Sequence, residues 1–195
     1  LRNSGSRKAA FSVKTEISND VGNIVAEDTS EVVIESGKGR INRQRILIRQ
    51  ASLWSAETPI LYNASVKLIG TGADVVLDQS EATFGIRILQ LDSSRGLRVN
   101  GQTVKLRGAC IHHDSGLFGA AVYEAVEFRQ IHKLKEAGFN AVRMSHHPMA
   151  PAMLRACDFL GMYVMDEYSD MWTRMKGGFD YGLFFDEWWK SDVEA

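Results

Sequence analysis

The chain has 195 residues, of which 45% are hydrophobic and 24% are charged, values typical of a globular protein with a packed core rather than a disordered chain. Its 23 basic and 24 acidic side chains leave a formal charge of -1, and no apolar run approaches the roughly 18 residues of a membrane span. These values argue against a nucleic-acid-binding protein and against a membrane protein.

Short alternating segments predict β-strands in the first part of the chain. From Phe11 to Ser18, apolar and polar residues alternate with the period of two expected for a half-buried strand. Similar runs occur at Val32 to Ile34, Arg45 to Gln50, Ile60 to Leu68 and Asp74 to Leu77. Several short strands without an intervening helix are typical of an antiparallel sandwich of immunoglobulin type, which we place at residues 8–86.

Beyond residue 86 the pattern changes to strands that alternate with helices. The predicted strands are Val104 to Ile111, Asn140 to Met144 and Met162 to Met165, and the predicted helices are Glu124 to Ala137 and Pro151 to Leu160. Pro151 suits the first position of a helix, and Gly138 and Gly161 are plausible helix ends. Buried parallel strands joined by helices indicate an α/β sheet or barrel, which we place at residues 87–195.

Polar clusters follow each of these three strands: His112-His113-Asp114, Ser145-His146-His147 and Asp166-Glu167. In a β/α barrel the carboxyl ends of the strands form the active-site face, so these clusters are expected to belong to one site. The two cysteines, Cys110 and Cys157, lie in apolar segments without metal-ligand spacing and are expected to be buried free thiols.

A metal-dependent hydrolase using His112, His146 and Asp166 is one alternative for this site. Adjacent residues of a strand point to opposite faces, so each histidine pair offers one member to a given ion. The sequence also has no HxH or HExxH spacing. We therefore predict no metal.

Acid–base chemistry on a sugar is the second alternative, because aromatic rings stack on sugars while carboxylates and imidazoles bind their hydroxyl groups. Asp166 and Glu167 face opposite ways and cannot be the pair of carboxyl groups, about 5–5.5 Å apart, of a retaining glycosidase. A purely structural interpretation is equally compatible with the sequence: Asp166 would cap backbone amides, and Arg143 would be its buried ion-pair partner.

Several long motifs resemble glycoside hydrolase family 2, the β-galactosidase, β-glucuronidase and β-mannosidase group. They are TPILYNASVKL, FGIR, LRVNGQTVKLRGACIHHDSGLFGAA, LKEAGFNAVRMSHHPMAP, LRACDFLGMYVMDEYSDMW and DYGLFFDEWWKSD. The resemblance is strongest to bacterial β-galactosidases. It implies an immunoglobulin-like sandwich (8–86) followed by the first three β/α units of a (β/α)8 TIM barrel (87–195), which together are a fragment of a larger enzyme.

The resemblance also implies which residues bind the sugar. His112, Asp114, His146, Asp166, Asp170 and Trp172 match substrate-binding positions, and Arg143 matches the arginine that orients the catalytic nucleophile. His113 and His147 differ from the residues usual in the family, so no role is carried over to them. The family's two catalytic glutamates end strands beyond the third, and no Asn-Glu pair occurs in this sequence. The magnesium-binding stretch of the best-known β-galactosidase is absent as well, and no cofactor is expected.

The implied activity is hydrolysis of terminal β-galactosides with retention of configuration, with β-glucuronides or β-mannosides as the alternative substrates. The chain by itself is expected to be inactive, to bind a β-linked carbohydrate, and to bind neither nucleic acid nor membrane. Uncovered strand edges favour self-association, for example as a homo-oligomer. A non-catalytic carbohydrate-binding or interaction module remains a further alternative, and the cellular compartment is left open.

Overall fold

The computed structural model describes residues 1–72 and 75–194, which divide into two compact units. The first unit comprises Leu1–Ser55 and Ile60–Ile88, and the second comprises Ala56–Pro59 and Leu89–Ala195. No helix among the described residues is both long enough and apolar enough to cross a membrane.

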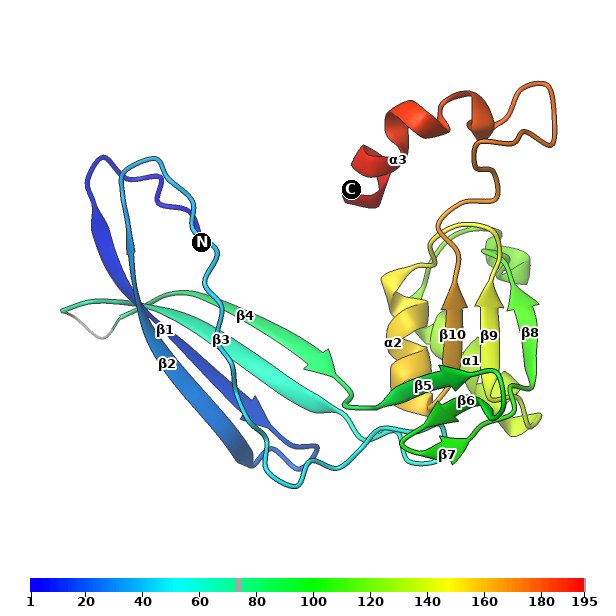
Figure 1. The fold of residues 1–195 in the computed structure, drawn as a ribbon, viewed down its shortest axis with the longest axis horizontal. Helices are drawn as coiled ribbons and strands as arrows, with labels where there is room; N and C mark the ends of the chain where they lie inside the picture. The colour runs from blue at the N-terminus through cyan, green and yellow to red at the C-terminus, as the bar shows by residue number, and fades with distance from the viewer. Residues whose placement is uncertain (73–74, 195) are drawn as a thin grey trace. The chain divides into compact units, whose positions relative to one another are not determined.

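The first unit contains one antiparallel sheet with the strand order β2-β1-β3-β4 (Figure 1). Its strands are β1 (Ala9–Ser18), β2 (Ile24–Ile34), β3 (Tyr62–Gly70) and β4 (Val76–Phe84). One face carries the apolar residues Val13, Val32 and Ile34, packed with the partly buried Phe11 and Leu68. The other face is polar, because residues one position away point to the opposite side of the sheet.

The predicted strands of this unit are confirmed in part. The strand predicted at Val32 to Ile34 is the end of the longer β2, and Asp74 lies outside the described residues. The segment Arg45 to Gln50 is not a strand, and the described residues 40–61 contain none. It alternates in burial as a strand would, and the preceding residue, Gln44, contacts β1 through its side chain, since Gln44 Nε2 donates to the Val13 carbonyl oxygen over 2.9 Å. One sheet of the predicted sandwich is therefore observed.

The second unit begins with a small antiparallel sheet that the sequence pattern did not reveal. It has the order β5-β6-β7, formed by β5 (Leu89–Asp92), β6 (Gly96–Val99) and β7 (Gln102–Thr103). This sheet precedes the segment predicted as a strand from Val104 to Ile111. Only Gly108–Ile111 of that prediction forms a strand, β8.

A parallel sheet with the order β10-β9-β8 forms the centre of the second unit, and its strands run in the same direction in Figure 1. Here β8 is joined by α1 (Glu124–Glu136) to β9 (Ala141–Met144), and β9 is joined by α2 (Pro151–Leu160) to β10 (Tyr163–Asp166). The predicted β/α alternation is confirmed. The sheet has three strands and is open, as expected for part of a barrel. The 3-10 turn η1 (Gly116–Phe118) precedes α1, and the 3-10 turn η2 (Tyr181–Leu183) precedes the last helix, α3 (Phe185–Glu194).

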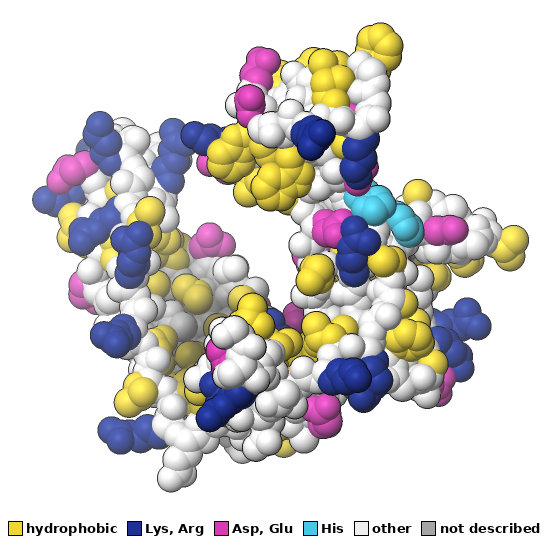
Figure 2. Space-filling model, turned by 45° about the vertical axis from the view of Figure 1, so that its right-hand side comes forward, with side chains coloured by type: hydrophobic (Ala, Val, Ile, Leu, Met, Phe, Trp, Pro, Cys, Tyr) yellow, Lys and Arg dark blue, Asp and Glu magenta, His cyan; other side chains and the backbone are white. Residues whose placement is uncertain are grey.

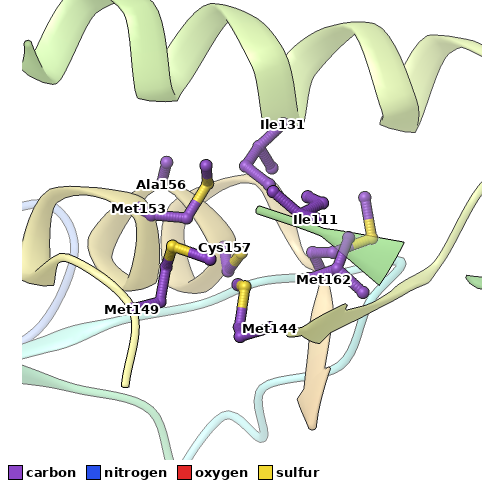
Figure 3. Close-up of a cluster of buried hydrophobic side chains, with 9 residues drawn as sticks. Ile111, Ile131, Met144, Met149, Met153, Ala156, Cys157 and Met162 are labelled. Carbon is purple, nitrogen blue, oxygen red and sulfur yellow. The ribbon is translucent and has the colours of Figure 1, made fainter. Parts of the chain in front are cut away.

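The main core lies between this sheet and its two long helices (Figure 3). Ile131 of α1, Met153 and Cys157 of α2, and Ile111 and Met144 of the strands are all at most 4% exposed. Burial of these side chains is what attaches α1 and α2 to one face of the sheet, here called the helix side. The opposite face, here called the pocket side, carries Cys110 of β8, Arg143 of β9 and Met165 of β10, which pair in register.

Gly161 ends α2 in a left-handed conformation, with φ of 76°, as the sequence predicted. A Cβ atom at this position would also collide with the carbonyl oxygen of Ala56. Lys135 of α1 ties the same two residues together, since its Nζ donates to the carbonyl oxygens of Ala56 and Gly161, each over 2.6 Å. The short segment Ala56–Pro59 is in this way part of the second unit.

Candidate functional site

A cavity of about 470 Å³, here called the strand-end pocket, lies beyond the carboxyl ends of β9 and β10. It is lined by Arg143, Asp166, Glu167, Tyr168, Ser169, Asp170, Trp172 and Lys176. Figure 2 shows histidine side chains at the molecular surface beside acidic and basic side chains. The strand-end pocket thus combines charged groups with two aromatic rings, Tyr168 and Trp172.

Arg143 and Glu167 form the central ion pair of this pocket. Arg143 pairs in register with Met165, so by strand alternation the side chain two residues later, that of Glu167, projects from the same side. The Nε atom of Arg143 donates a hydrogen bond to Glu167 Oε1. This hydrogen bond lowers the pKa of the Glu167 carboxyl and raises that of the guanidinium.

His146 lies between two carboxylates. Its Nδ1 is 3.3 Å from Glu167 Oε2 and 3.6 Å from Asp170 Oδ1. Asp170 in turn accepts a hydrogen bond of 2.6 Å from Lys176 Nζ, which lowers the pKa of the Asp170 carboxyl. Both carboxyls are therefore ionised at neutral pH, so neither holds the proton that a general acid must deliver.

Aromatic rings surround Phe185 next to the pocket. The ring of Trp172 stacks on Phe185 with a centroid distance of 5.8 Å, and Trp189 stacks on Phe185 at 6.4 Å. Trp172 is nevertheless 62% exposed, which leaves much of its indole accessible to a ligand. Tyr181 donates a hydrogen bond to Asp192, which raises the pKa of the Tyr181 hydroxyl.

The structure brings together most of the residues predicted to bind substrate. Arg143, Asp166, Asp170 and Trp172 line the strand-end pocket, and His146 contacts its carboxylates. The exposed His112 meets the His146 ring edge-on, with centroids 5.4 Å apart. Asp114 does not reach the pocket: its Oδ1 accepts from the Gly116 amide, and it lines a separate cavity of about 460 Å³ beside α1.

Asp166 lines the pocket and also contacts the backbone of Met149, since its Oδ1 accepts from the Met149 amide over 3.3 Å. This agrees with the structural interpretation of that residue. The proposed ion pair between Asp166 and Arg143 is wrong, because strand alternation directs Glu167, and not Asp166, to the pocket side, where Arg143 projects. Arg143 is also not buried, as 42% of its side chain is exposed.

The two cysteines differ in environment, and the expectation that both are buried is wrong for one of them. Cys157 is fully buried, and burial raises the pKa of its thiol to about 12. Cys110 is exposed, and its Sγ accepts a hydrogen bond of 3.4 Å from Arg143 Nη1. Hydrogen bonds from Ser145 and Arg143 lower the pKa of the Cys110 thiol. No group of three or more His, Cys, Asp or Glu residues that could hold a metal ion occurs within residues 1–72 and 75–194.

Sequence reasoning placed Glu167 in a strand-end cluster but gave it no role, and it missed Lys176 as a site residue. The alternation of a strand could have found Glu167, since it lies two residues after Met165, the neighbour of Arg143. Lys176 follows β10 in an irregular segment, and no periodic pattern relates it to Asp170.

Comparison with known proteins agrees with this arrangement. Residues 1–87 match the family model described as glycosyl hydrolases family 2, and residues 91–179 match the model of the TIM barrel domain of the same family. The chain belongs to glycoside hydrolase family 2. The family assignment made from the sequence motifs is thereby confirmed.

Two curated members of family 2 illustrate the relationship. The chain is 39% identical over 172 residues to the β-galactosidase BoGH2A of Bacteroides ovatus, a match that covers 88% of this chain and 20% of that protein. It is 37% identical over 148 residues to a putative β-glucuronidase of Formosa agariphila, covering 75% of this chain and 14% of the relative. The chain therefore spans about a fifth or less of the length of these relatives.

Solved structures of family 2 members share the fold. A family 2 member from Bacteroides cellulosilyticus superimposes with a TM-score of 0.86 at 36% identity, covering 100% of this chain and 25% of that one. A β-glucuronidase from Bacteroides uniformis gives a TM-score of 0.79 at 29% identity, covering 86% of this chain and 20% of the other. Both names, galactosidase and glucuronidase, thus occur among its relatives.

Proposed function

We propose that the chain supplies one side of the sugar pocket of a retaining glycoside hydrolase that cleaves terminal β-galactosides. The observation that carries the proposal is the strand-end pocket, where Trp172 offers an accessible ring face beside the ionised groups of Arg143, Glu167 and Asp170. A sugar uses both kinds of surface, because its C–H face stacks on an aromatic ring and its hydroxyl groups bind carboxylates and imidazoles.

The role proposed for each residue is the one that the family resemblance implies, and its contacts are compatible with that role. Asp170, His146 and His112 would bind sugar hydroxyl groups, and Arg143, which Glu167 holds in place, would orient the nucleophile. Because Glu167 and Asp170 have lowered pKa values, neither is suited to protonate the leaving group. In this proposal both catalytic carboxyl groups belong to parts of the enzyme outside the 195 residues.

The charges of the pocket favour a neutral sugar over a glucuronide. The two cations that line it are both paired with carboxylates, Arg143 with Glu167 and Lys176 with Asp170. A glucuronide would bring a third carboxylate next to these groups. Neither of the two cations of this lining would be free to pair with it. This supports the galactosidase alternative for the side of the pocket that the chain forms.

The test is hydrolysis of a panel of nitrophenyl β-glycosides by this chain and by the product of the complete reading frame. We expect the chain to be inactive, and the longer product to cleave the galactoside faster than the glucuronide or the mannoside. Hydrolysis by the 195-residue chain would contradict the assignment of the catalytic pair to other segments. Tight sugar binding without hydrolysis by either protein would favour a binding module.

A further inference from the structure

The four histidines that follow β8 and β9 form two separate ring contacts. While His112 meets His146 beside the pocket, the ring of His113 stacks on His147 with centroids 4.8 Å apart. The Nε2 atom of His113 accepts a hydrogen bond of 3.2 Å from the backbone amide of Ala150. An imidazole that accepts through Nε2 is neutral and carries its proton on Nδ1, so the contact selects one tautomer of His113.

Glu127 of α1 is the charged group that interacts electrostatically with His113. Its side chain is 2% exposed, its Oε2 has no hydrogen-bond partner among the described residues, and burial raises the pKa of the carboxyl. From α2, the thiol of Cys157 is the other titratable group that interacts with Glu127. A buried carboxyl without a hydrogen-bond partner is costly.

The segment from Ser145 to Ala150 links β9 to α2 and carries His146 to the pocket. Side chains from both neighbouring strand ends attach its last two amides. Met149 donates to Asp166, the last residue of β10, and Ala150 donates to His113, which follows β8. The path of this segment, and with it the position of the His146 ring, depends on these two hydrogen bonds.

We propose that His113 is a positioning residue: it holds the Ser145–Ala150 segment so that His146 stands between Glu167 and Asp170. His113 does not touch the sugar, since it acts from the helix side. The positioning itself is a property of the chain, and only its effect on sugar binding rests on the proposed function. Outer contacts of this kind commonly change affinity or activity by about 10–100-fold in metal sites, where they have been measured best.

Amide hydrogen exchange in the 195-residue chain tests the positioning directly. In His113→Phe, which keeps a ring against His147 but has no acceptor, the protection factor of the Ala150 amide is expected to fall about 10-fold or more. In His113→Gln, whose amide oxygen can replace Nε2, protection is expected to stay within about 3-fold of the wild type. The core amide of Ile131 reports whether each variant is folded.

A second measurement keeps the proposal testable if His113→Phe does not fold. Long-range ¹H–¹⁵N spectra of the wild type are expected to show His113 as the Nδ1–H tautomer, because its Nε2 accepts from the Ala150 amide. An Nε2–H tautomer in the wild type, or Ala150 protection that does not change in a folded His113→Phe, would overturn the inference.

The effect on function is separate from this result. In the complete enzyme, His113→Phe is expected to reduce kcat/KM by about 10-fold or more, and His113→Gln to restore most of it. If the exchange data agree but no β-glycoside is hydrolysed by the wild type, then the proposed function fails while the positioning stands. Equal kcat/KM in a folded His113→Phe and the wild type would contradict the link to the site.

Discussion

The pocket side and the helix side of the parallel sheet carry the same residue types in different chemical states. Cys110, Glu167 and the pair His112–His146 lie on the pocket side, where they meet charged groups or solvent. Cys157 and Glu127 belong to the helix side, as does His113, which lies two residues beyond Ile111. The carboxyl of Glu167 has a lowered pKa and that of Glu127 a raised one. Residue type alone therefore predicts little; the side of the sheet decides the chemistry.

The largest expected difference between the two sides is in thiol reactivity. At neutral pH iodoacetamide should alkylate Cys110 at least about 1000-fold faster than Cys157, because Cys110 is exposed with a lowered pKa whereas Cys157 is buried with a pKa of about 12. Peptide mapping by mass spectrometry measures both rates in one sample. Cys110→Ser is the control that removes the fast reaction. Comparable labelling of both thiols in the folded chain would break the comparison.

Two methionines of neighbouring strands sharpen the comparison in terms of stability. Met144 on the helix side is 0% exposed, and Met165 on the pocket side is 60% exposed. Met144→Ala should reduce the free energy of unfolding by about 2–5 kcal/mol, since it leaves a cavity in the core. Met165→Ala should change it by no more than about 0.5 kcal/mol. Urea denaturation of the two variants would show which face is packed, and equal losses would refute the assignment of faces.

A smaller effect is expected from Glu167→Gln, and it depends on pH. The hydrogen bond from Arg143 lowers the pKa of Glu167 below its ordinary value of 4.5, so the ionised form stabilises the fold. This stabilisation is present above pH 4.5 and is lost as the pH falls through the lowered pKa. The Tm of the wild type should thus exceed that of Glu167→Gln at pH 7, and the two should converge in acid.

Asp166→Asn is the matched control for this measurement. An asparagine keeps an oxygen that can accept from the Met149 amide, so Asp166→Asn is expected to change the Tm at pH 7 less than Glu167→Gln does. A Tm difference for Glu167→Gln that is the same at pH 7 and at pH 3 would argue against the ion pair with Arg143.

The elements that sequence predicted well are those with a strong local signal. The helices α1 and α2 begin where predicted, at Glu124 and at Pro151, because their apolar positions repeat at helical spacing. A glycine that follows each helix marks its end. The strands from β5 to β7 have four residues or fewer, too short for a period of two to be recognised. The segment at Arg45 shows the opposite failure: its alternation is real, but a strand also needs a backbone partner, which no local pattern supplies.

The candidate site was predictable to the extent that it follows strand ends. Arg143, His146 and Asp170 were predicted and line or contact one pocket, because parallel strands bring their carboxyl ends to the same edge. The ion-pair partner of Arg143 was missed by one position, which is the distance that reverses the direction of a side chain. The hydrogen bond between His113 and the Ala150 amide joins residues 37 apart and has no sequence signature.

The contact of Lys135 with Ala56 has a consequence for how the protein is made. The two residues are 79 positions apart, and Ala56 belongs to the second unit although residues 60–88 of the first unit follow it. At a synthesis rate of about 5–20 residues per second, Ala56 leaves the ribosome several seconds before the lysine that binds it. The first unit can fold as its residues emerge, but the second unit can complete its fold only after Lys135 has emerged. A polypeptide that started at residue 87 would lack this segment altogether, and the ammonium group of Lys135 would keep one of its two carbonyl partners.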